Sequence, residues 1–122
     1  KATERGDFQI AASAWAADYP DAENFYMLFY GKNAPPGQNS GNFQNKEYDT
    51  LYEEIRFMPN SSERFAKIKR MAQIFQEEVP AALGSTGIIT GLLQKWVRNF
   101  KRNMMLSYPL KFIDIDEKLY AE

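Results

Sequence analysis

The sequence predicts an α/β fold, composed mostly of helices, with a few strands that complete sheets elsewhere. Residues 8–14 alternate apolar side chains on one face with Gln, Ala and Ser on the other, which is typical of a strand. Residues 47–57 and 65–79 repeat apolar side chains at intervals of three and four, which is typical of helices packed on a core. Because the strand over 8–14 has no partner nearby in the sequence, we expect its sheet to be completed by other polypeptide.

A turn and a first helix follow that strand. Asp21 is expected to cap a helix that runs through the letters ENFYMLFY, with Gly31 closing it in a left-handed conformation. Residues 31–46 are predicted to be a loop, because they contain a Pro-Pro-Gly run and a series of Asn, Ser and Gly. That loop is long for a connection inside a compact domain.

Two further helices are predicted next. Asn45 can cap the helix over 47–57, and Pro59 ends it. The turn before Arg64 can cap the helix that follows, which ends at Pro80. The expected core stripe of the first is Tyr48, Leu51, Tyr52, Ile55 and Met58, and that of the second is Phe65, Ile68, Ala72, Phe75 and Val79.

After Pro80 the sequence predicts strands rather than helices. Residues 81–83 and 88–93 have the character of short strands, separated by the letters GSTG. Residues 95–100 are expected to form a turn or short helix, and a last strand is expected over 110–115.

Composition excludes several function classes. The net charge is −1, so no basic field would attract nucleic acid, and none is expected as a partner. Without His or Cys, the commonest general base, the thiol nucleophile and the usual transition-metal ligands are missing. We therefore expect no catalysis, no cofactor and no metal. No apolar run is long enough to span a membrane. The first residues lack an initiator Met, so we expect the chain to begin inside a longer protein.

Four motifs occur in order along the chain: GDFQIAASAWAADYPDAENF (6–25), NFQNKEYDTLYEE (42–54), SSERFAKIKRMAQIFQEEVPAAL (61–83) and QKWVRNF (94–100). Each alone is weak, but four with this order and spacing are specific. Together they resemble the C-terminal quarter of the extracytoplasmic solute-binding proteins of ABC importers, peptide/nickel-binding group (family 5). The sequence departs from that pattern at Ala22, Phe43 and Lys46, which leaves the class of solute open.

The resemblance implies a two-lobed periplasmic-binding-protein fold of type II. Residues 1–86 would form the C-terminal portion of the second, ligand-binding lobe, and residues 87–122 would return to the first lobe. Such a protein captures a small peptide or similar polar solute between its lobes and presents it to ABC permease subunits. It would be periplasmic or extracellular, peripheral to the membrane, with or without a lipid anchor. A piece of this kind would expose apolar surface and could self-associate.

The resemblance also assigns the site. Trp15 would line the pocket, and Asp18 would pair with the ligand's α-ammonium group. From the residues alone, an isolated tryptophan such as Trp15 is more often a core residue, and Asp18 is better explained as the start of a turn. Asn42 could offer its amide to a polar ligand, although ordinary turn chemistry explains it better.

Two other functions stay open at this point. The chain could be an independent helical protein-interaction module that docks through the face of residues 65–79. An enzyme is the third option, and the absence of His and Cys makes it the weakest.

Overall fold

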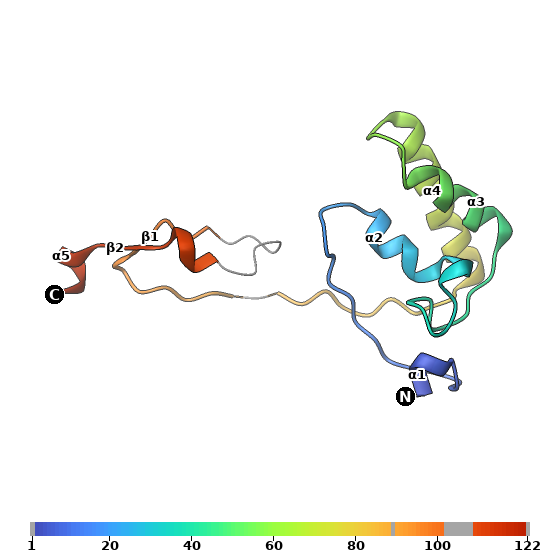
Figure 1. Cartoon of the computed structure of the whole chain (residues 1–122), viewed down its shortest axis with the longest axis horizontal. Helices are drawn as coiled ribbons and strands as arrows, with labels where there is room; N and C mark the ends of the chain where they lie inside the picture. The colour runs from blue at the N-terminus through green and yellow to red at the C-terminus, as the bar shows by residue number, and fades with distance from the viewer. Residues whose placement is uncertain (1, 89, 102–108, 122) are drawn as a thin grey trace. The chain divides into compact units, whose positions relative to one another are not determined.

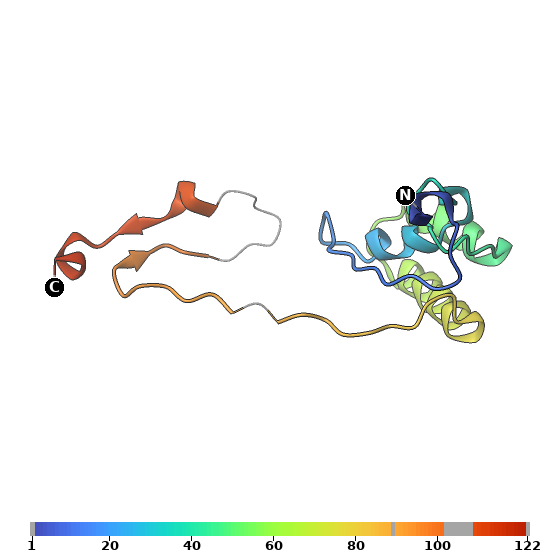
Figure 2. The same cartoon turned by 90° about the horizontal axis from the view of Figure 1, so that it is seen from below.

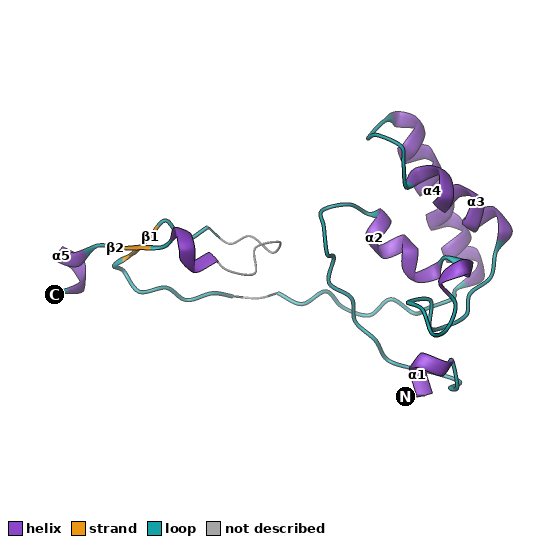
Figure 3. Cartoon of the chain, in the orientation of Figure 1, coloured by secondary structure: helices purple, strands orange, loops and turns teal. Residues whose placement is uncertain are grey.

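The computed structural model describes residues 2–88, 90–101 and 109–121. The chain divides into two compact units, Lys1–Leu83 and Gly84–Glu122, each of which is described by itself. Figure 3 shows the longer helices in the first unit and both strands in the second. The first unit contains α1 (Ala2–Arg5), α2 (Glu23–Tyr26), the 3-10 helices η1 (Met27–Phe29) and η2 (Gly31–Asn33), α3 (Lys46–Ile55) and α4 (Ser62–Glu78). The second contains β1 (Val97–Arg98), the 3-10 helix η3 (Pro109–Phe112), β2 (Asp114–Ile115) and α5 (Glu117–Tyr120).

Helices α3 and α4 form a helical hairpin and lie side by side in both Figure 1 and Figure 2. Asn45 caps α3, and its side chain accepts a hydrogen bond from the Tyr48 N–H at 2.9 Å. Ser61 caps α4 in the same way through the Arg64 N–H. Helix α4 ends at Val79, whose φ of 46° is left-handed, directly before Pro80. Both predicted helices are confirmed to within one or a few residues at each end.

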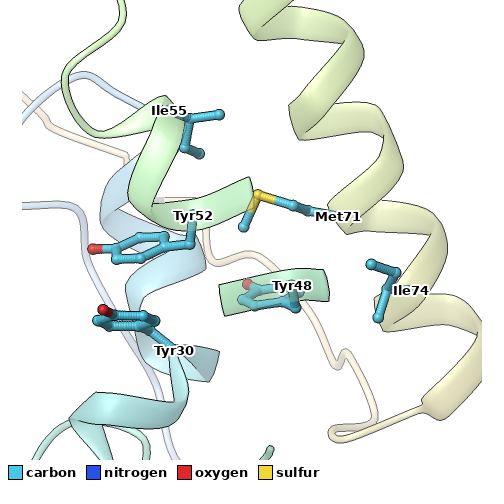
Figure 4. Packing of buried hydrophobic residues seen from close by; sticks show 6 residues of the cluster. All are labelled: Tyr30, Tyr48, Tyr52, Ile55, Met71 and Ile74. Atoms are coloured by element: carbon cyan, nitrogen blue, oxygen red, sulfur yellow. The ribbon is translucent and has the colours of Figure 1, made fainter. Parts of the chain in front are cut away.

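The core of the first unit lies between this hairpin and the segment that precedes it. Its buried apolar residues are Tyr30, Tyr48, Tyr52, Ile55, Met71 and Ile74. The ring of Tyr30 packs on that of Tyr52 with centroids 4.5 Å apart, and Met71 extends from α4 toward α3 (Figure 4). The stripe predicted on α3 is confirmed at its three buried members.

The stripe predicted on α4 is confirmed in its middle and wrong at its two ends. Ile68 packs against the core, and Phe75 packs edge-on against Phe29. Met71 and Ile74 are buried, whereas Phe65 is 60% exposed and Val79 is 63% exposed. The helix is rotated because Arg64, only 5% exposed, faces inward and donates to the Ile55 carbonyl at 3.0 Å. The apolar spacing on α4 was compatible with burial of either of two neighbouring faces, and contacts with α3 decide which of them is buried.

The first predicted helix is shorter and tighter than expected. It begins as α2 and continues as η1 and η2, and Asp21 precedes the N-cap position, which is Ala22. Gly31 lies inside η2 and has no left-handed φ, so its predicted role is wrong. It is instead required by close approach, because a Cβ there would lie 2.5 Å from Asp49 Oδ2, and its N–H donates to Asp49 Oδ1 at 2.8 Å.

The predicted loop is confirmed apart from η2 at its start, and a buried asparagine organises it. Asn39 is 1% exposed and donates to the carbonyls of Tyr30 and Phe43, while its Oδ1 accepts from the Phe43 N–H. This arrangement holds the Phe43 ring edge-on against Tyr48, with centroids 5.5 Å apart. The loop is therefore packed onto the core.

Three of the predicted strands are wrong within the described residues. Residues 8–14 and 81–83 form no strand, and neither do the described members of 88–93, of which residue 89 lies outside the described part. Most of these side chains are exposed, for example Ile10 at 92% and Leu92 at 93%. A strand needs a neighbouring strand to pair its backbone groups, and none of these segments has one among the described residues.

The second unit holds the small antiparallel sheet in which Val97 pairs with Ile115 and Arg98 with Asp114. The turn predicted over 95–100 is present at residues 95–96, where the Val97 N–H donates to the Gln94 carbonyl at 3.0 Å, and β1 follows it. The last predicted strand is shorter than expected, because its first half is η3. Trp96 packs edge-on against Tyr120, with ring centroids 5.4 Å apart. The described chain is thus mostly helical with one two-stranded sheet, and a two-lobed type II architecture stays a prediction.

Candidate functional site

The candidate site is the turn between Trp15 and Asn24, where the chain folds back onto the first turn of α2. The Trp15 indole Nε1–H donates to Asn24 Oδ1 at 2.8 Å. The Asp18 backbone N–H donates to the same oxygen at 3.1 Å. The Asn24 Nδ2 group donates to Asp18 Oδ2 at 3.3 Å. One side chain, completely buried, therefore brings the two predicted site residues together.

Both predicted site residues remain accessible in this turn. Trp15 is 38% exposed, so its indole is not sealed in a core. The Asp18 side chain is exposed as well. An indole face and a carboxylate displayed from one turn can offer stacking and a negative charge to the same small molecule.

Asn42 is placed differently. It lies in the loop before α3 with a left-handed φ of 51°, a conformation that asparagine adopts more readily than most residues. Its Oδ1 accepts from Gln44 Nε2 at 3.2 Å. No hydrogen bond within the described residues joins it to Trp15 or Asp18. Turn chemistry accounts for its position, and its contact with a ligand stays a prediction.

A buried carboxylate fixes the turn to α3. Glu23, next to Asn24, is only 9% exposed and accepts hydrogen bonds from the hydroxyl groups of Tyr19 and Tyr52. The bond to Glu23 raises the pKa of Tyr19, and burial followed by the same kind of bond raises the pKa of Tyr52. Both phenols therefore stay protonated donors at neutral pH. Arg56 Nε lies 4.0 Å from the carboxylate and offsets its charge.

A buried guanidinium fixes the turn to α4. Arg64 Nη2 lies 2.8 Å from Asp21 Oδ1, and Nη1 donates to Asn60 Oδ1 at 2.7 Å. With the bond from Nε to the Ile55 carbonyl, all three nitrogens of the guanidinium have partners. Asp21 also accepts from the Glu23 N–H at 2.8 Å. Charged pairs with this many hydrogen bonds offset the cost of burying the charge.

The Asp21–Arg64 pair predicts an acid-dependent stability. The hydrogen bond from Arg64 holds the pKa of Asp21 below its ordinary value of 3.8. A carboxyl with a lowered folded-state pKa stabilises the fold fully above its unfolded-state pKa and loses that contribution as the pH falls through the folded-state value. Urea unfolding of Asp21→Asn should therefore show a smaller loss of stability between about pH 5 and about pH 2 than the parent chain.

The matched control is Asp7→Asn, because Asp7 is highly exposed and lies 3.9 Å from an exposed Arg5. The free energy of unfolding of Asp7→Asn should depend on pH in the same way as that of the parent chain. An Asp21→Asn profile parallel to the parent profile would show that this pair does not couple the turn to the hairpin.

The chain is similar to binding proteins. A protein of Haemophilus influenzae that is named only as a binding protein is 34% identical over 92 residues, which cover 67% of this chain and 17% of that protein. The oligopeptide-binding protein OppA of Bacillus subtilis is 32% identical over 76 residues, which cover 62% of this chain and 14% of OppA. The chain thus spans less than a fifth of either relative. These similarities support a relationship to solute-binding proteins.

Other comparisons add no family or fold. No protein-family model matches the chain, and no solved structure matches it significantly. Within residues 2–88, 90–101 and 109–121, no helix is long and apolar enough to cross a membrane. The same residues contain no cluster of three or more Asp or Glu side chains arranged to hold a metal ion.

Sequence reasoning did not single out Asn24 or Glu23. Asn24 stands in the Asn-Phe step that ends the first motif, so a signal for it was present in the sequence. In the structure, Glu23 is a buried acceptor for the hydroxyl groups of two tyrosines. Their partners lie up to 29 positions away, beyond the reach of a local pattern.

Proposed function

We propose that this chain is the C-terminal part of an extracytoplasmic solute-binding protein of an ABC importer, peptide/nickel-binding group, which captures a small peptide or similar polar solute without performing chemistry. The observation that carries the proposal is the accessible indole and carboxylate of Trp15 and Asp18, held in one turn by a buried amide. Similarity to a named oligopeptide-binding protein supports the class of ligand.

The chemistry suits a peptide with a free amino terminus. A carboxylate forms a charge-assisted hydrogen bond with an ammonium group, and exclusion of water around the pair strengthens it. An indole face can stack on a peptide plane or on an apolar side chain. Asp18 would therefore bind the α-ammonium group while Trp15 forms the pocket wall, with Asn42 as a further polar contact.

The proposal includes an arrangement of the chain in two lobes. Residues 1–86 would belong to the ligand-binding lobe and residues 87–122 to the other lobe, with the opposite wall of the pocket supplied by further polypeptide. Closure of the lobes would bury the ligand, and the closed form would be the one that permease subunits bind. Such a protein would act in the periplasm or outside the cell.

The experiment that tests the function compares peptides that differ only at the amino terminus. A set of short synthetic peptides with free amino termini and the same set N-acetylated would be titrated into the full-length protein by calorimetry. We expect the free peptides to bind and acetylation to weaken binding at least about tenfold, because it removes the charge. Absence of binding by any peptide, or equal affinity for both sets, would contradict the proposal.

The exposed side of α4 favours a second candidate, a helical interaction module. Phe65 on α4 and Val79, which directly follows the helix, present exposed apolar side chains. A module of this kind would bind a protein partner and be indifferent to peptides in the same titration. Self-association of the chain through this surface is a further prediction, which sedimentation would measure.

A further inference from the structure

Asn24 is completely buried, and its side-chain amide binds the two predicted site residues, Trp15 and Asp18. We propose that Asn24 is a positioning residue, which fixes the Trp15 indole and the Asp18 carboxylate in the geometry that binds the ligand and does not itself contact the ligand. This inference rests on the proposed function of the Trp15–Asp18 turn.

The hydrogen-bonding capacity of the amide supports this role. An amide oxygen has two lone pairs, and both are used, by the indole N–H at 2.8 Å and by the Asp18 backbone N–H at 3.1 Å. The amide nitrogen donates to Asp18 Oδ2 at 3.3 Å. Because Asn24 has no exposed surface, a ligand in the turn would meet Trp15 and Asp18 first.

Each bond constrains a different degree of freedom of the site. The indole has a single donor, so its bond to Asn24 fixes the direction of the ring edge and leaves the ring faces for stacking. The bond to Oδ2 holds one carboxylate oxygen of Asp18, while Oδ1 accepts no hydrogen bond from the described residues. A preset indole and carboxylate lose less conformational freedom when a ligand binds.

Asn24 is itself held firmly enough to act as a reference point. Its backbone N–H donates to the Asp21 carbonyl at 3.2 Å, in the first turn of α2. Two residues that precede it in the same turn, Asp21 and Glu23, are bound to α4 and α3 through Arg64 and Tyr52. Movement of Asn24 would therefore have to break contacts with both helices of the hairpin.

The test is a double-mutant cycle in the full-length protein, with a short free-amine peptide selected by the calorimetric titration. Asn24→Ala should lower affinity by roughly ten- to a hundredfold in the parent protein and by less than about threefold in the Asp18→Ala background. A purely structural role would give the same loss in both backgrounds, and that result would overturn the inference.

Asn24→Asp is the isosteric variant for the case in which the alanine variant unfolds. It keeps an acceptor for the indole and for the Asp18 N–H but replaces the amide donor with a second carboxylate next to Asp18. Peptide affinity should fall, since two adjacent carboxylates repel and the Asp18 side chain turns away. Unchanged affinity in a folded Asn24→Asp protein would contradict the positioning role.

A spectroscopic readout separates this inference from the proposed function. The indole N–H resonance of Trp15, assigned with Trp15→Phe, should move upfield in Asn24→Ala and stay nearly in place in Asn24→Asp. Asn39→Ala is the matched control, because Asn39 is equally buried and makes three hydrogen bonds within the loop. An indole resonance that ignores Asn24→Ala overturns the positioning role, whereas an unchanged affinity in Asp18→Ala alone overturns the function.

Discussion

Replacing Asp18 with alanine is expected to weaken binding of a free-amine peptide by about 2 to 4 kcal/mol, which corresponds to roughly 30- to 1,000-fold. The carboxylate is exposed in the chain by itself but would be desolvated when a second lobe closes over the ligand. An ammonium group enclosed there without its partner would keep the cost of desolvation and lose the compensating charge. Calorimetry on the full-length protein measures the difference directly.

Two controls separate loss of the charge partner from a general effect of the substitution. Asp7→Ala removes another exposed aspartate of the same unit, and peptide affinity should be unchanged. An N-acetylated peptide should bind the parent protein and Asp18→Ala with similar, weak affinity, because it has no ammonium group. If Asp18→Ala bound the free peptide as tightly as the parent protein, Asp18 would only be part of a turn.

The second large effect concerns stability. Met71→Ala should lower the free energy of unfolding by about 2 to 4 kcal/mol, because the side chain is completely buried between α4 and α3 and its loss leaves a cavity. Phe65→Ala, on the same helix, should cost less than about 1 kcal/mol, since Phe65 is 60% exposed. Urea unfolding of the 122-residue chain, followed by far-ultraviolet circular dichroism, gives both values.

This pair of variants also decides which face of α4 forms the core. The apolar stripe predicted from the sequence included Phe65 and omitted Met71, while the structure buries Met71. A cost for Phe65→Ala equal to or larger than that for Met71→Ala would mean that α4 is rotated toward the predicted face. The Arg64 contacts that set the present rotation would then have to be absent.

Features governed by a few neighbouring residues could be predicted from the sequence. The cap of α3 at Asn45 and the end of α4 before Pro80 are confirmed, and so is the spacing of three and four residues between buried positions on α3. A capping bond spans three residues, and a proline acts on the turn that precedes it. The spacing of Trp15 and Asp18 is likewise a local feature of the sequence, whereas the exposure of Trp15 is known only from the fold.

Features that depend on distant partners could not be predicted in this way. The alternation over residues 8–14 is real in the sequence, yet no strand forms, because pairing requires a second backbone that the described residues do not place there. Gly31 was interpreted as a left-handed cap, whereas its small size serves the approach of Asp49 from α3. In each case local preference permitted a conformation that the surroundings did not use.

The sequence by itself determined where α3 and α4 begin and end, and which turn carries the indole and the carboxylate. Only the tertiary structure decided that α4 turns Met71 inward, that Glu23 serves two tyrosines and that Asn24 joins Trp15 to Asp18. The physical reason is the distance along the sequence over which each kind of interaction acts. Backbone dihedral preferences and caps act within one helical turn, whereas burial and side-chain hydrogen bonds depend on groups that folding brings together from up to 43 positions apart.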